Sequence, residues 1–332
     1  DGPAGEKAEG SIVSNLTGGG GGVTNTRATI ELAFLVLLWY TTSIYYTNTT
    51  RSLSMHWGVM ALVQVIIASI CSIITIPAFN LSPGRRIRLL PTRAALRTTG
   101  ALAISFGAGF VFLNAALCMM HVSLVMVLRA LEPLSMAALS LSLLGESTSL
   151  RAGGALVSIC TGSALSAAES ADFTGLGLLV TFCANLSFSL CAIFAKKLKQ
   201  EHGVDDYNIF LQCSTLSAPL FLAMLLVLRA MNVDLMLPAA VEGFKSGVLI
   251  LNGISFFVYN QFAWIVLGRV SAVTYTVMAA VRKTFVCICG VIQFGNPVSP
   301  LSAFGIGLTS IGSLFYADAK RVEAEASVKE DA

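Results

Sequence analysis

The sequence has very little charge for its length. Only 12% of its 332 residues are charged, whereas about 25% is typical of a soluble domain. Hydrophobic residues make up 55%. A soluble protein of this size would need far more polar surface to cover its core. The composition therefore excludes an ordinary soluble domain and indicates a membrane protein.

The sequence also lacks the patterns of common catalytic and metal sites. Its three histidines, His56, His121 and His202, fall in predicted loops and are too scattered for a metal site or proton relay. All eight cysteines lie in apolar runs without CxxC spacing, which is typical of small buried side chains. No nucleophile–base constellation and no phosphate-cradling loop is found. The net charge is only +3, and no basic run is interleaved with aromatics. We expect no enzymatic activity, metal, cofactor or nucleic-acid partner.

Apolar runs of membrane-spanning length fill most of the chain. A helix needs about 20 predominantly apolar residues to cross a bilayer, and ten such stretches can be drawn. They run over 30–48, 57–79, 98–119, 122–144, 152–168, 174–195, 207–228, 246–268, 272–294 and 301–317. We therefore predict an all-α membrane protein with ten transmembrane helices.

The two ends of the chain are polar. Residues 1–29 include a run of glycines from Gly18 to Gly22 and predict a flexible tail, and residues 319–332 predict a polar C-terminal tail. The chain begins at Asp1 rather than at a methionine. We therefore expect an upstream segment to have been removed, in the cell or by trimming.

Basic residues are distributed unevenly over the predicted loops. With both termini on one side of the membrane, the loops and tail of that side carry twelve of them, and the other side carries Arg51, Arg229 and Lys245. Cytoplasmic loops are enriched in Lys and Arg, so the termini are predicted on the cytosol-like side. The twelve are Arg85, Arg86, Arg88, Arg93, Arg97, Arg151, Lys196, Lys197, Lys199, Arg269, Lys320 and Arg321.

The two halves of the chain are weakly similar. The fourth span ends at Gly145, and Gly162 lies seventeen residues further on; in the second half, Gly295 and Gly312 have the same spacing. Because each half has an odd number of spans, one half must be inverted relative to the other. Inverted repeats are a recurring transporter architecture, with the substrate bound between them. The predicted five-helix repeats are residues 30–168 and 174–318.

Four charged residues are predicted inside the spans. Arg129 and Glu132 lie in the fourth span, and Arg282 and Lys283 lie about halfway along the ninth. A charge at the bilayer centre costs at least ~2.5–3.5 kcal/mol on insertion scales and tends to be functional. The two adjacent cations cannot neutralise each other. An anion is their simplest partner, because Arg offers a planar fork for phosphate oxygens and Lys adds a point charge.

Each of these residues also has a structural explanation. Arg129 and Glu132 are three residues apart and can pair on their own helix. For Arg282 and Lys283, the structural explanation requires Glu132 or another distant acid as the partner. The Arg282–Lys283 tandem is therefore the stronger sign of an anion site.

Two further features have ordinary explanations. Lys196 and Lys197 end the sixth span on the basic side, where lysines commonly extend to the membrane surface. Lys197 is kept as a candidate auxiliary contact. Trp39 and Tyr40 lie near the end of the first span and are interpreted as interfacial aromatics.

Several short motifs are more specific than these patterns. They are Leu128-Arg-Ala-Leu-Glu-Pro133, Leu144-Gly-Glu146, Ala184-Asn-Leu-Ser-Phe188, Ala195-Lys-Lys197, Tyr259-Asn-Gln261, Arg269-Val-Ser271, Arg282-Lys283, Pro297-Val-Ser-Pro300 and Phe315-Tyr-Ala-Asp-Ala-Lys320. Together they resemble the plastid phosphate translocators, in the triose-phosphate translocator and nucleotide-sugar transporter group of the drug/metabolite transporter superfamily. The resemblance extends from about Trp39 to Arg321.

This resemblance implies a fold, an activity and a set of site residues. It implies ten spans in two inverted halves and strict counter-exchange of phosphorylated metabolites for inorganic phosphate. Arg129 and the Arg282–Lys283 tandem correspond to the cations that hold the phosphate in the family. Tyr259 corresponds to a tyrosine that faces the substrate.

The chain also departs from the family pattern. A histidine and a threonine of the third span that contact substrate in the sugar-phosphate exchangers are replaced here by Phe110 and Leu113, and an arginine of the sixth span is replaced by Cys191. We therefore predict that Phe110 and Leu113 form a more apolar wall of the substrate pocket.

These observations predict an antiporter that works by alternating access. It would exchange a phosphorylated small metabolite, such as a triose phosphate or phosphoenolpyruvate, for inorganic phosphate, surrounded by the lipid of a plastid-type envelope. The alternative is a nucleotide-sugar/nucleotide-monophosphate antiporter of the Golgi or endoplasmic reticulum. A membrane scaffold that kept the fold is a third hypothesis, and the mid-membrane tandem argues against it.

Overall fold

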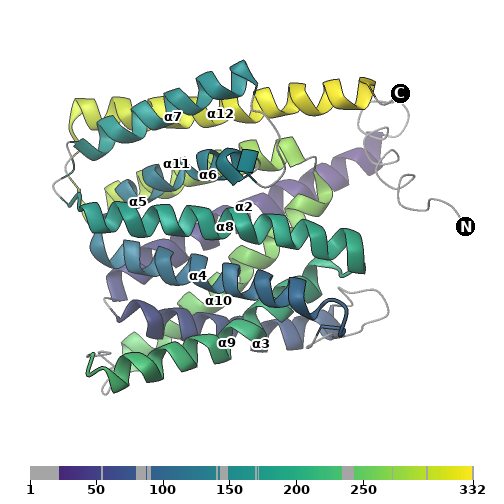
Figure 1. Cartoon of the computed structure of the whole chain (residues 1–332), viewed down its shortest axis with the longest axis vertical. Helices are drawn as coiled ribbons and strands as arrows, with labels where there is room; N and C mark the ends of the chain where they lie inside the picture. The colour runs from purple at the N-terminus through teal and green to yellow at the C-terminus, as the bar shows by residue number, and fades with distance from the viewer. Residues whose placement is uncertain are drawn as a thin grey trace, which may run out of the picture.

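A computed structural model describes residues 22–330, apart from residues 54, 80–86, 88–90, 140, 143–148, 169, 171, 234–242, 271 and 297. Long helices make up nearly all of this part of the chain (Figure 1). In chain order they are α2 (Gly22–Leu53), α3 (Trp57–Ala78), α4 (Leu96–Met119), α5 (Val122–Arg129), α6 (Glu132–Leu139), α7 (Leu150–Ala168), α8 (Gly175–His202), α9 (Asp206–Ala230), α10 (Gly243–Arg269), α11 (Ala272–Phe294) and α12 (Pro300–Glu330).

Most of these helices are suited to a bilayer. Within the described residues, nine helical stretches are long and apolar enough to cross a membrane, one of them made of α5 and α6 together. The predicted all-α membrane fold is therefore confirmed. The remaining predicted span, the fifth (152–168), corresponds to α7, which has 19 residues and is not among these nine. The count of ten stays a prediction.

The ends of the helical bundle differ from the expected tails. Helix α2 begins at Gly22, so the last residues of the predicted N-terminal tail 1–29 are helical, and residues 1–21 lie outside the described part. Helix α12 continues to Glu330, through most of the predicted polar tail 319–332. A helix tolerates polar residues once it has left the bilayer, so span prediction underestimates its length. The start of α2 and the end of α12 lie at the same end of the bundle (Figure 1).

The main helix pairs each join one half of the chain to the other. The most extensive contacts are those of α7 with α12, α4 with α8, α2 with α10, and α3 with α9, and α5 packs on α11. Counted as spans, these pairs are five with ten, three with six, one with eight, two with seven, and four with nine. Exchanging each span with its counterpart in the other half reproduces the same set of pairs. A pseudo-two-fold axis would produce this pattern, and the inverted relation of the halves stays a prediction.

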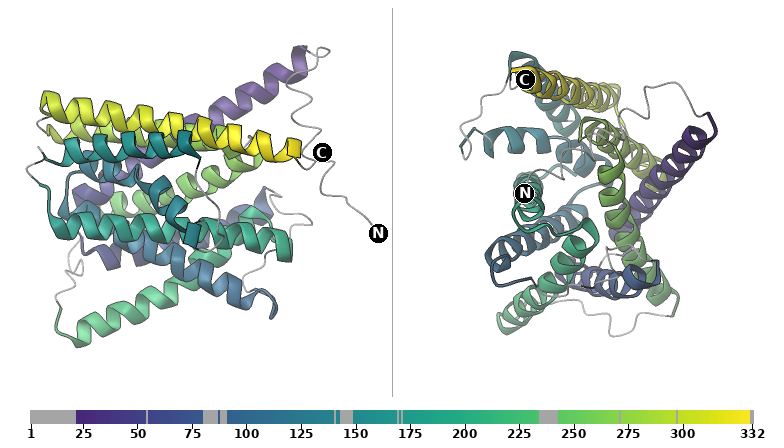
Figure 2. Two further views of the ribbon diagram at one scale, coloured as in Figure 1. Left: turned by 45° about the horizontal axis from the view of Figure 1, so that its top comes forward. Right: turned by 90° about the vertical axis from the view of Figure 1, so that its right-hand side faces the viewer.

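Glycines allow α7 and α12 to pack closely. A Cβ atom added at Gly162 would lie 2.6 Å from the carbonyl oxygen of Gly305, and one added at Gly312 would lie 3.0 Å from the backbone nitrogen of Ile159. Because residue numbers fall along α7 as they rise along α12, the two helices are antiparallel. Small residues are favoured where membrane helices approach closely. In the two views of Figure 2, the yellow α12 lies toward one edge of the bundle and the green α9 toward the opposite edge.

Candidate functional site

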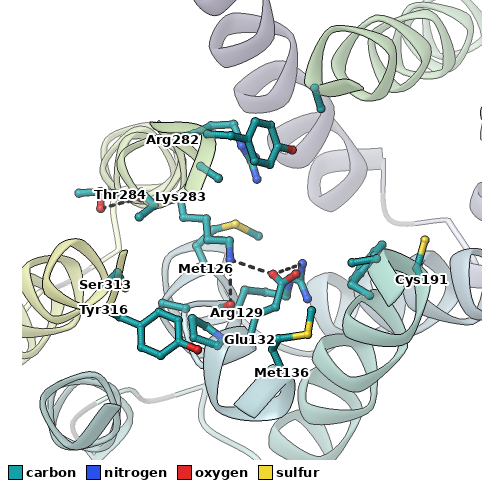
Figure 3. A pocket seen from close by; sticks show the side chains of 18 of the residues that line it. Met126, Arg129, Glu132, Met136, Cys191, Arg282, Lys283, Thr284, Ser313 and Tyr316 are labelled. Carbon is teal, nitrogen blue, oxygen red and sulfur yellow. Dashed lines mark hydrogen bonds and ion pairs between the residues drawn. The ribbon is translucent and has the colours of Figure 1, made fainter. Parts of the chain in front are cut away.

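A cavity of about 690 Å³ lies between helices of both halves. Its lining residues come from α4, α5, α6, α8, α10, α11 and α12. All four charged residues predicted inside the spans, Arg129, Glu132, Arg282 and Lys283, line it. Figure 3 shows these side chains converging from α5, α6 and α11. The fold therefore brings together the two charged pairs that lie about 150 residues apart in the sequence.

A break in the fourth span shapes one side of the cavity. The predicted span 122–144 is interrupted, because α5 ends at Arg129 and α6 begins at Glu132, although the two together are long and apolar enough to cross a membrane. Pro133 explains the break: proline has no backbone N–H, and its ring clashes with the carbonyl of the residue four positions earlier, which is Arg129. The Arg129 carbonyl oxygen instead accepts a hydrogen bond of 3.2 Å from Nζ of Lys283. A helix C-terminus is an electrostatically favourable place for such a cation.

Glu132 lies between two of the cations. Its Oε2 is 2.9 Å from Nζ of Lys283 and 3.1 Å from a guanidinium nitrogen of Arg129. Lys283 therefore has the acid partner that the structural explanation of the tandem requires, Glu132 on another helix. The sequence named Glu132 as a possible partner but did not show that the two residues meet, because the packing of α11 on α5 places their side chains together.

Arg282 differs from its neighbour Lys283. In the described part of the chain, no carboxylate lies within ion-pair distance of its guanidinium. The guanidinium donates a hydrogen bond to Oγ of Ser43 and lies 5.0 Å from the Tyr259 ring centre and 5.5 Å from that of Trp39. Its Nε is buried and makes no hydrogen bond to a described residue. Arg282 is thus held by neutral groups, and its charge remains available to an anion.

The cavity carries a net positive charge. Arg129, Arg282 and Lys283 contribute three positive charges and Glu132 one negative charge, and Lys196, Lys199 and Lys320 also line the cavity, so cations predominate. A phosphate monoester carries −1.5 to −2 at neutral pH. The excess of positive charge in the cavity therefore suits an anionic ligand such as a phosphate ester.

The other predicted site residues lie in different places. Tyr259 and Phe110 line the cavity, and the Tyr259 ring stacks on Tyr46 with 5.7 Å between ring centres. Leu113 does not line the cavity and is buried in the hydrophobic core. Lys197 does not line it either, and its ammonium lies 3.7 Å from Glu201 at the surface. On α8 the cavity is instead lined by its neighbours Lys196 and Lys199, and Lys320 of α12 lines it as well.

Two residues that support the cations were not predicted from the sequence. Asn185 of α8 accepts a 2.6 Å hydrogen bond from Arg129 through Oδ1, and Phe188 lies one turn later with its ring centre 4.4 Å from the same guanidinium. A buried amide in an apolar span was the available signal for Asn185. Trp39 was interpreted as an interfacial aromatic, but it is 1% exposed and lies beside Arg282.

Comparison with known proteins identifies the family. Residues 30–317 match the Triose-phosphate Transporter family. The chain belongs to this family. The resemblance to the plastid phosphate translocators is thereby confirmed. The match covers all ten predicted spans.

Individual relatives are more distant. The chain is 29% identical over 314 residues to phosphoenolpyruvate/phosphate translocator 3, chloroplastic, of Oryza sativa subsp. japonica, which covers 89% of this chain and 76% of the relative. It is 27% identical over 317 residues to the triose phosphate/phosphate translocator, non-green plastid, chloroplastic, of Brassica oleracea var. botrytis, covering 89% and 74%. A protein of known crystal structure with 16% identity has a TM-score of 0.53 and covers 88% of this chain and 97% of its own, which shows a shared fold.

Proposed function

We propose that this chain is an antiporter of the plastid envelope that exchanges a phosphorylated small metabolite for inorganic phosphate. The observation that carries the proposal is the cavity with an excess of positive charge, in which Arg282 has no acidic partner among the described residues. The names of the relatives favour this function over nucleotide-sugar exchange, because they are plastid translocators of phosphorylated metabolites.

Each charged residue has a proposed role. Arg282 binds the phosphate oxygens through its guanidinium, whose Nε makes no hydrogen bond to a described residue. Lys283 and Arg129 supply further positive charge. Tyr259, whose ring lies beside Arg282, donates a hydrogen bond. Glu132 neutralises part of this charge while the cavity is empty. The substrate is carried without chemical conversion.

The net charge also explains why transport should be coupled. An empty cavity that closes must remove uncompensated cations from water, which is costly. A bound phosphate offsets this charge and permits closure. Exchange in both directions, and not release of phosphate alone, is therefore expected as the two halves rock against each other.

Liposomes test this function directly. The purified protein is reconstituted into liposomes loaded with phosphate. Uptake of labelled phosphate, triose phosphates, phosphoenolpyruvate, hexose phosphates and nucleotide sugars is then measured. Each compound taken up should be recovered without chemical change. We expect uptake of phosphate and phosphorylated metabolites only into preloaded liposomes, loss of uptake in Arg282→Ala, and normal uptake in Arg151→Ala, which removes an exposed arginine outside the cavity. Uptake of nucleotide sugars alone would support the alternative function.

A further inference from the structure

Arg282 is contacted in part by α2, a helix whose described residues do not line the cavity. The lining residues come from other helices, whereas Trp39, Tyr40 and Ser43 of α2 lie outside the lining. In Figure 3, dashed lines join the other three charged side chains, and Arg282 lies apart from them. The position of this cation therefore depends on residues that the substrate does not reach.

Helix α2 is fixed against the face of α11 that carries Arg282. Trp39 stacks on Tyr275 with 5.2 Å between ring centres and 13° between ring planes. The hydroxyl of Tyr40 donates a hydrogen bond to the carbonyl oxygen of Met278. Tyr275, Met278 and Arg282 are spaced three and four residues apart, so they share one face of α11. These contacts hold Trp39 in a defined place beside Arg282.

The contacts of Arg282 hold its guanidinium without neutralising it. Oγ of Ser43 accepts one hydrogen bond from it. Its guanidinium carbon lies 5.0 Å from the centre of the Tyr259 ring and 5.5 Å from that of the Trp39 ring. An aromatic ring attracts a cation through its quadrupole and supplies no negative charge. The charge and the remaining N–H donors of Arg282 therefore stay available to an anion.

Trp39 carries a cost that a smaller apolar side chain would avoid. It is 1% exposed, and its buried Nε1 makes no hydrogen bond to a described residue. A buried donor without a partner is destabilising. Of the aromatic side chains, however, tryptophan attracts a cation most strongly. The contact with Arg282 gives a physical reason for a tryptophan at this position.

We infer that, given the proposed phosphate exchange, Trp39 is a positioning residue for Arg282. It holds the guanidinium in place before phosphate binds, so less side-chain freedom is lost on binding. Trp39 does not touch the phosphate and acts through Arg282. Its removal should therefore weaken the binding of phosphate more than it slows the movement of the loaded protein.

Substitutions of Trp39 test this role through the KM of phosphate homo-exchange in liposomes. Trp39→Leu removes the ring and should raise KM by on the order of ten-fold, the effect of a desolvated cation–π contact. Trp39→Phe keeps a weaker ring and should raise KM by only roughly three-fold. Trp57→Leu makes the same change at a tryptophan outside the cavity and should leave KM unchanged. The maximal rate per reconstituted protein should be similar in all four proteins.

A double variant tests whether Trp39 acts through Arg282. Arg282→Lys keeps the charge but replaces the planar guanidinium by an ammonium. Because both substitutions disturb the same contact, their effects should not be additive. Adding Trp39→Leu to Arg282→Lys should therefore raise KM by a smaller factor than Trp39→Leu does alone. An equal factor in both backgrounds would show that Trp39 does not act through Arg282 and would overturn the inference.

The outcomes separate this inference from the function on which it rests. If Trp39 only supports packing, Trp39→Leu lowers the melting temperature and the maximal rate but leaves KM unchanged, and the inference is overturned. If Trp39→Leu cannot be purified, Trp39→Phe decides, because an unchanged KM in that variant also overturns the inference. Absence of phosphate homo-exchange in the parent protein overturns the proposed function itself.

Discussion

At the scale of single residues, Arg282 and Lys283 are adjacent in the sequence but lie in different electrostatic surroundings. Lys283 has Glu132 at 2.9 Å, whereas Arg282 contacts a hydroxyl and two aromatic rings. Removing one partner of a buried ion pair leaves the other charge uncompensated, but removing an unpaired charge does not. The two tandem positions should therefore respond differently to substitution.

Arg282→Ala should abolish phosphate exchange without lowering stability. The substitution removes a cation that folding must take from water, so the melting temperature without ligand should stay equal to that of the parent or rise. The increase in melting temperature caused by phosphate should disappear, because that increase depends on binding. Melting curves with and without phosphate, together with liposome exchange, test both statements. Arg282→Lys with Lys283→Arg keeps both charges and should retain activity; full exchange by Arg282→Ala would show that this residue is structural.

Lys283→Ala should lose exchange and also lose stability. Glu132 would keep only Arg129 as its partner, and we expect destabilisation of up to about 3 kcal/mol, near the lower end for breaking a buried pair. Adding Glu132→Gln to this variant removes the stranded charge and should recover the melting temperature but not transport. A melting temperature of Lys283→Ala equal to that of the parent would mean that the pair with Glu132 contributes nothing to stability.

At the scale of helices, the contact of α7 with α12 depends on missing side chains. A Cβ at Gly162 would meet backbone atoms of Gly305 and Thr309 at 2.6 Å, whereas one at Gly153 on the same helix would meet nothing within 4 Å. Gly162→Ala should therefore lower the melting temperature by several degrees. Gly153→Ala should leave it unchanged or raise it, since alanine favours helix by about 1 kcal/mol. Equal effects of the two variants in thermal unfolding would show that the helices do not pack at Gly162.

At the scale of the whole molecule, the path of α7 decides the number of membrane crossings. Two exposed residues flank this helix: Leu150 is the first residue of α7, and Gly175 is the first residue of α8, which follows it. In a cysteine-free background, Leu150→Cys and Gly175→Cys are labelled with a membrane-impermeant maleimide in sealed, oriented vesicles. We expect labelling from opposite sides, which makes ten crossings with both termini on one side. Labelling of both positions from the same side would leave nine crossings and separate the termini.

Much of this architecture could be predicted from the sequence, because it depends on properties read along the chain. The length of each apolar run determines whether it can span a bilayer, and the low charge excludes a soluble surface. A charge inside such a run is costly wherever the helices pack, so Arg129, Glu132, Arg282 and Lys283 stood out as site candidates. The family motifs added Tyr259 to them, and Tyr259 also lines the cavity.

Only the tertiary structure decided which of these groups meet. Lys283 and Glu132 are 151 residues apart, and their ion pair exists because α11 packs on α5 and a proline frees the carbonyl of Arg129. Phe110 and Leu113 are three residues apart on α4, yet only Phe110 reaches the cavity, because the rotation of the helix within the bundle sets which side chains face inward. Such pairings and orientations depend on how helices cross in three dimensions, a property that apolar length and charge along a single chain do not contain.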